Sequence, residues 1–123
     1  MATRKQPENE EMKAFFAYCK TFEHLHPCWK LAFHVPNEGK FPIQYRVKLK
    51  SLGVKSGVPD IIIPVACGKY HGLAIEMKVK PNKPSEIQKE WLKHLTFYGW
   101  LAKVCYGWQE ATDLVANYIK GKV

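Results

Sequence analysis

The chain has 123 residues, the length of one domain, and 46% of them are hydrophobic, which is enough for a single core. Lysine and arginine number 19 against 11 acidic residues, and the resulting formal charge of +8 favours a polyanion such as nucleic acid as partner. No apolar run approaches the roughly 20 residues of a membrane span, and the polar N-terminus carries no secretory signal, so we expect a cytoplasmic, single-domain protein over residues 1–123.

The first predicted element is a helix from Glu8 to about Glu23. Its apolar residues recur at helical spacing and form one stripe, made of Met12, Phe15, Phe16, Cys19 and Phe22. Glu8 and Glu11 each lie four residues before a member of this stripe, so both can border the buried face. The simpler interpretation is that they only stabilise the helix N-terminus, where negative charge gains about 0.3–1 kcal/mol. The pattern leaves both interpretations open.

The next stretch predicts a strand, a loop and a short helix. Residues Cys28–Val35 follow Pro27 and alternate apolar with polar side chains, which is typical of a strand. Two prolines and a glycine then predict a loop over Pro36–Pro42. Residues Gln44–Leu52 predict a basic helix that ends at Gly53.

Basic residues gather in and just after this short helix, namely Arg46, Lys48, Lys50 and Lys55. One interpretation is an ordinary solvated face. The other is a set of phosphate contacts, which position a nucleic acid on its protein. We favour the second interpretation, because the four residues immediately precede the strand that Asp60 enters.

Residues Gly57–Lys80 predict a β-hairpin. Two runs rich in branched residues, GVPDIIIP and LAIEMKVK, flank a break with two glycines, and we expect a loose loop at Cys67–Gly72. Side chains on a strand alternate between faces, so Glu76 and Lys78 share one face. In an antiparallel pair, any register that sets Asp60 opposite either of them brings all three to that face.

Two carboxylates and a lysine at one strand edge suit a hard cation. Mg²⁺ prefers oxygen ligands, usually one or two carboxylates with water and substrate phosphate. Such a cation lowers the pKa of bound water and stabilises charge on a phosphate, and Lys78 would hold the water or neutralise the same phosphate. The alternative is the solvated face of an amphipathic strand. The place of Asp60, directly after Pro59 at the entry of an apolar strand, favours the cation site.

Ser85 and Gln88 have the spacing of a capping box and predict the start of a helix that Gly99 ends. Gln88 also lies on the helix face of Trp91 and Leu92, which packs inward, and a polar side chain at that edge needs a partner. Both roles stay open for Gln88.

The last two elements are a strand at Leu101–Tyr106 and a helix at Gln109–Lys120. The unit from the Glu76 strand through the Ser85 helix to Leu101 is β-α-β, so its strands should be parallel. The predicted fold class is therefore α/β, with a central mixed sheet flanked by helices.

The cysteines are scattered along the chain at Cys19, Cys28, Cys67 and Cys105, without a C-x-x-C pair. They indicate reduced thiols and not a zinc site. His24, His26 and His34 also lack the spacing of zinc ligands.

Pro59-Asp60 followed by Glu76-Met77-Lys78 resembles the PD-(D/E)XK nuclease signature. A wider set of motifs resembles the VRR-NUC family: residues 36–39 (PNEG), 49–54 (LKSLGV), 57–60 (GVPD), Ser85, Gln88 and Trp91-Leu92. The resemblance extends from about Glu8 to Tyr118 and is strongest to stand-alone members, of the kind found in phages.

The resemblance implies a restriction-endonuclease-like core and a set of site residues. Asp60, Glu76 and the Met77 carbonyl would hold Mg²⁺ or Mn²⁺, while Lys78 would position or activate the water. Gln88 and a glutamate of the first helix would complete the site. The apolar pattern aligns that glutamate best with Glu8, and Glu11 is the nearby rival.

The implied function is metal-dependent hydrolysis of DNA by a homodimer that cuts four-way junctions. Two alternatives remain: a nuclease for flaps, ends or ordinary duplex, and a DNA-binding protein that does not cut. The carboxylates of Asp60 and Glu76 argue against the second alternative, because acids repel phosphate and binding alone does not need them.

Overall fold

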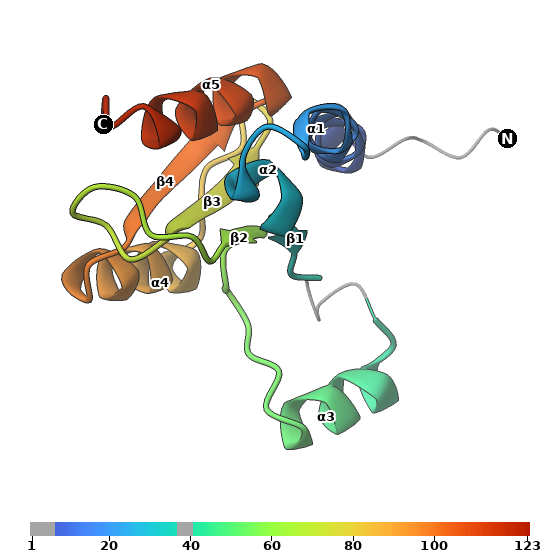
Figure 1. Cartoon of the computed structure of the whole chain (residues 1–123). Coiled ribbons are helices and arrows are strands. Elements are labelled where there is room, and N and C mark those ends of the chain that lie inside the picture. Colours follow the sequence, from blue (N-terminus) through green and yellow to red (C-terminus); the bar gives the residue numbers. More distant parts are fainter. Residues whose placement is uncertain (1–6, 37–40) are drawn as a thin grey trace, which may run out of the picture.

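The computed structural model describes residues 7–36 and 41–123, and Figure 1 shows how their helices and strands are arranged. The elements are α1 (Pro7–Phe22), α2 (Pro27–Leu31), β1 (Phe33–His34), α3 (Ile43–Ser51), β2 (Ile61–Ile63), β3 (Leu73–Lys78), α4 (Glu86–Phe97), β4 (Leu101–Tyr106) and α5 (Trp108–Ile119). The predicted loop at Pro36–Pro42 falls mostly on residues 37–40, outside the described part of the chain.

The strands form one mixed sheet in the order β1-β2-β3-β4. β2 pairs antiparallel with β3, as the hairpin pattern predicts, and its other edge pairs antiparallel with β1. β3 pairs parallel with β4 across α4, as the β-α-β unit predicts. Figure 1 shows α1 and α5 over one face of the sheet and α4 on the other. The predicted α/β class, a mixed sheet flanked by helices, is confirmed.

The register of the hairpin separates the core from the polar face. Ile61 pairs with Ile75, so the register continued by one residue sets Asp60 opposite Glu76. The alternate side chains Ile61, Ile63, Ile75 and Met77 are fully buried. They belong to the core that α1 and α5 cover, together with Phe15, Val115 and Tyr118. The hydrophobic side of the hairpin therefore fixes which way the acids point.

The strand predicted at Cys28–Val35 is wrong for most of its length. Residues Pro27–Leu31 form α2, and only Phe33–His34 form a strand. Proline is favoured at the first position of a helix, and the His26 side chain accepts a hydrogen bond from the Cys28 amide as the N-cap. Cys28 and its neighbour Trp29 are both buried in the core, where the Trp29 ring packs against Tyr18 of α1.

The short basic helix is confirmed as α3. It ends in a Schellman motif, in which Gly53 donates to the Lys50 carbonyl and Val54 donates to the Leu49 carbonyl. Gly53 has φ +93°, a conformation that favours glycine. Every residue of α3 is at least partly exposed, and Figure 1 shows the helix standing away from the sheet.

The remaining predicted elements are close to those observed. Leu101–Tyr106 is β4, and α5 begins one residue before its predicted start. The capping box of Ser85 and Gln88 begins α4. Within the described residues, no helix is both long enough and apolar enough to span a membrane.

Candidate active site

A pocket of about 170 Å³ lies between α1, β1, β3 and α4, at the residue that precedes β2. Its lining includes most of the side chains that the sequence nominated: Glu8, Asp60, Glu76, Lys78 and Gln88. Asn9, Met12, His34, Pro36 and Phe41 line the rest. Residues separated by up to 80 positions in the chain are therefore brought to one concave site, as expected for a functional pocket.

Asp60 is fixed through both its backbone and its side chain. Its carbonyl oxygen accepts a hydrogen bond from the Val35 amide at 2.8 Å and lies 2.9 Å from His34 Nδ1. Its carboxylate oxygen Oδ2 accepts a hydrogen bond from the Met77 amide at 2.9 Å. These contacts hold the Asp60 carboxylate against β3, beside Glu76.

Glu76 is an acid in a nearly closed environment, with 2% of the residue exposed. Burial raises the pKa of its carboxyl group to about 9, and the charge of Asp60 and the hydrogen bond to it act in the same direction. Two facing carboxyl groups thus retain a proton when no cation lies between them. Carboxylate oxygens are the ligands that hard divalent cations prefer, so this pair fits such a cation in place of the proton.

Lys78 bridges two acids at the edge of the pocket. Its Nζ lies 3.6 Å from Glu76 Oε2 and 3.7 Å from Glu8 Oε1, and 12% of its side chain is exposed. The acidic side chains of Glu76 on β3 and Glu8 on α1 therefore hold the ammonium group between them. An ammonium held in this way can donate to a water molecule or a phosphate oxygen in the pocket.

Glu8 and Glu11, which the sequence could not distinguish as pocket residues, have different surroundings in the structure. Glu8 lines the pocket and contacts Lys78. Glu11 instead accepts a hydrogen bond from the Trp108 amide at 3.0 Å, at the first residue of α5. Its carboxylate caps the N-terminus of that helix, where negative charge is favourable.

Gln88 serves both of the roles that the sequence left open. Its Oε1 accepts a hydrogen bond from the Ser85 amide at 2.8 Å, and the Ser85 hydroxyl accepts one from the Gln88 amide at 3.3 Å. The same side chain lines the pocket. Because its oxygen is used by the helix cap, the amide nitrogen is the group with which Gln88 can bind a ligand.

The predicted DNA-contacting residues divide into two groups. Arg46, Lys48 and Lys50, called the α3 cations below, lie on the helix that stands away from the sheet. Lys55 lines a small cleft together with Asp60 and Gln88, next to the main pocket. Lys55 is therefore a direct neighbour of Asp60.

His34 is a pocket residue that sequence reasoning missed. It lines the pocket and contacts the Asp60 backbone, because β1 pairs with β2 in the register of His34 with Ile61. The only local signal was a histidine in a short alternating run, and that signal does not tell which strand will be its neighbour.

The comparisons with known proteins agree with this geometry. The family model of the VRR-NUC domain matches residues 11–109. A solved structure described as a VRR_NUC domain protein is similar, with a TM-score of 0.80 and 30% sequence identity. That match covers 96% of this chain and 92% of the other. No curated protein matches the chain. The family model covers well over half of the sequence, so the chain belongs to the VRR-NUC family and carries a nuclease domain of the PD-(D/E)XK type.

Proposed function

We propose that the chain is a metal-dependent DNA endonuclease that hydrolyses phosphodiester bonds in this pocket. The observation that carries the proposal is the pairing of Asp60 with the buried Glu76, beside the Lys78 ammonium group, which lies between Glu76 and Glu8. Binding alone does not explain the pair, because two acids in a pocket repel phosphate. A cation site at the point of cleavage does explain it.

The residues present fit Mg²⁺ or Mn²⁺. The carboxylates of Asp60 and Glu76 and the backbone carbonyl of Met77 would hold the ion through oxygen atoms. When bound, the ion supplies an acidified water and stabilises negative charge on the phosphate.

The other pocket residues act on water and phosphate directly. Lys78 donates to the attacking water or to the phosphate oxygen on which charge develops. Glu8 lines the pocket and is a positioning residue, because it acts through its contact with the Lys78 ammonium. Gln88 orients a water or phosphate oxygen through its amide nitrogen, while its oxygen remains in the helix cap.

DNA would bind across the pocket towards α3. The α3 cations and Lys55 supply positive charge on the approach to Asp60, and the whole chain carries a formal charge of +8. Such contacts go to phosphates and fix the position of a duplex without reading its sequence. The substrate should therefore be recognised by its shape.

We propose four-way DNA as the preferred substrate and a homodimer as the active form. A two-fold dimer presents two Asp60–Glu76 pairs in a fixed relation, which matches the symmetry of a four-way junction. This part of the proposal rests on the likeness to stand-alone family members and on the small size of the domain. The alternative is a nuclease that acts on flaps, ends or plain duplex at a single site.

One side-by-side assay tests the function. Linear, flapped and four-way DNA are incubated with the protein in Mg²⁺, Mn²⁺ or EDTA, with Asp60→Ala as the matched inactive control. We expect metal-dependent cleavage, fastest on four-way DNA, and complete loss in Asp60→Ala with DNA affinity kept or raised. Cleavage in EDTA, or full activity in Asp60→Ala, would contradict the site. Equal rates on all substrates, or a monomer by light scattering at micromolar concentration, would leave a general endonuclease instead.

A further inference from the structure

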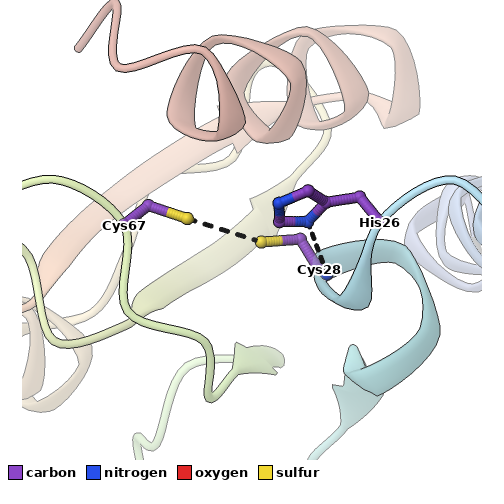
Figure 2. A group of neighbouring side chains, drawn as sticks. All are labelled: His26, Cys28 and Cys67. Carbon is purple, nitrogen blue, oxygen red and sulfur yellow. Dashed lines mark hydrogen bonds between the residues drawn. The ribbon is translucent and has the colours of Figure 1, made fainter.

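We propose that His26, Cys28 and Cys67 form a second metal site, which binds Zn²⁺ and is separate from the active-site pocket. His26 and Cys28 lie at the start of α2, and Cys67 lies in the connection between β2 and β3 (residues 64–72). One ring nitrogen and the two sulfur atoms all lie within 4.8 Å of one another. Figure 2 shows the three side chains converging between α2 and this connection.

The spacing of the sulfur atoms matches a shared cation. Cys28 Sγ and Cys67 Sγ are 3.9 Å apart. Two thiolates bound to Zn²⁺ at about 2.3 Å with a tetrahedral angle are about 3.8 Å apart. A disulfide would need the sulfurs at about 2.05 Å, which requires the backbone or the side chains to move. The observed pair thus needs little adjustment to hold an ion.

The ligand types decide which ion. Thiolates and imidazole are preferred by Zn²⁺, whereas Mg²⁺ and Mn²⁺ prefer carboxylate and water oxygens. The pocket at Asp60 offers oxygens, and the cluster at Cys28 offers sulfur and nitrogen. The two sites therefore differ in the cation that their ligand atoms prefer.

The backbone holds both sulfurs in place. Cys28 is fully buried in the first turn of α2. Cys67 begins a tight turn, in which Cys67 and Tyr70 exchange backbone hydrogen bonds at 3.2 and 3.0 Å. Ligands fixed by secondary structure and by a closed turn lose little freedom on binding an ion.

His26 sets a limit on the affinity. Its Nδ1 accepts a hydrogen bond from the Cys28 amide at 3.0 Å, so this nitrogen carries the lone pair of the ring. Coordination by the ring must displace that amide or move the ring proton, and it competes with the helix cap. Three protein ligands also leave the fourth tetrahedral position to water. Binding should therefore be weaker than at a closed four-ligand site.

Zn²⁺ at this place would join the two segments that frame Asp60. α2 leads into β1, whose His34 contacts the Asp60 carbonyl, and the Cys67 connection continues from β2. Without the ion these segments are linked at this point by the contact between two thiols. The ion would therefore stabilise the scaffold of the nuclease pocket without entering it.

Metal binding to the full reduced chain tests the site. After chelator treatment the protein is titrated with Zn²⁺ and with Co²⁺, and bound metal and thiolate-to-cobalt absorption are measured. We expect one Zn²⁺ per chain, with affinity lowered at least about tenfold in Cys28→Ser, Cys67→Ser and His26→Ala. The exposed His24→Ala and the buried Cys105→Ala serve as matched controls and should keep wild-type affinity.

Two further measurements separate this site from the pocket and from misfolding. Asp60→Ala should bind Zn²⁺ as the wild type does, so failure of the nuclease proposal would not affect the result. Zn²⁺ should raise the midpoint of thermal unfolding of the wild type and not of Cys67→Ser, whose substitution lies in a partly exposed turn. Equal Zn²⁺ affinity in wild type and Cys67→Ser, or a Cys28–Cys67 disulfide in a chain that takes up no Zn²⁺ when reduced, would overturn the proposal.

Discussion

Replacing Glu76 by glutamine should change how the stability of the metal-free protein depends on pH. Burial raises the pKa of the Glu76 carboxyl group from 4.5 to about 9 in the folded chain. Between these values the folded state binds one proton more than the unfolded state at this residue. The contribution of this proton to the free energy of unfolding is therefore complete below about pH 4.5 and is lost as the pH rises towards 9. Glutamine mimics the protonated acid at every pH, so Glu76→Gln removes this dependence.

The size of the effect follows from linkage. One proton of difference changes the free energy of unfolding by about 1.4 kcal/mol per pH unit. Between pH 6 and pH 8 the free energy of unfolding of the metal-free wild type should thus fall by roughly 3 kcal/mol more than that of Glu76→Gln. Every other ionisable group is common to both proteins, so the comparison isolates the contribution of Glu76.

Urea unfolding in EDTA, followed by tryptophan fluorescence at pH 6, 7 and 8, measures this difference. A cation would replace the proton, so Mg²⁺ should bind the wild type up to about tenfold more tightly for each pH unit in this range. Parallel stability profiles of wild type and Glu76→Gln would refute the reasoning. They would mean that Glu76 is already ionised in the metal-free protein.

Three further predictions concern the pocket and its approach. Lys78→Met should lower turnover by about 10²- to 10⁴-fold while DNA affinity, measured by anisotropy, is kept. Normal cleavage would mean that Lys78 only balances the charge of the neighbouring acids. Neutralising the three α3 cations together should make the logarithmic salt dependence of DNA binding shallower by roughly 2 to 3. An unchanged slope would place the DNA on another surface. Glu8→Ala should lower turnover roughly tenfold at nearly constant stability. Glu11→Ala should instead cost about 1 kcal/mol of unfolding free energy and leave turnover intact, since it removes a helix cap; the reverse pattern would exchange their roles.

The hairpin could be predicted from the sequence because one strong local pattern determines it. Four apolar side chains alternate with the acids, and burying them fixes both the register and the direction of Asp60 and Glu76. The helix ends at Ser85 and Gly53 could also be predicted, because both residues form their hydrogen bonds with residues close to them in the chain. These features depend on few residues that lie close together in the chain.

Features that depend on distant partners could not be predicted in this way. Alternation at Cys28–Val35 was compatible with a strand, but the chain forms a helical turn there, whose Trp29 packs against Tyr18 of α1. Glu8 and Glu11 have similar local surroundings, and only the positions of Lys78 and Trp108 separate them. Cys28 and Cys67 are 39 residues apart, so no spacing rule brings them together.

Because α3 is exposed, it can unfold and refold while the rest of the domain stays folded. The helix has nine residues, and isolated helices shorter than about 12–15 residues are marginal in water. Its last turn is stabilised by the Gly53 motif, but the core contributes little. Backbone amides of α3 should therefore exchange with deuterium long before those of β3, through openings that leave the sheet intact. If DNA binds this helix as proposed, binding must offset the entropy lost when the helix is ordered. Substitutions that raise helix propensity in α3 should then strengthen binding without touching the DNA.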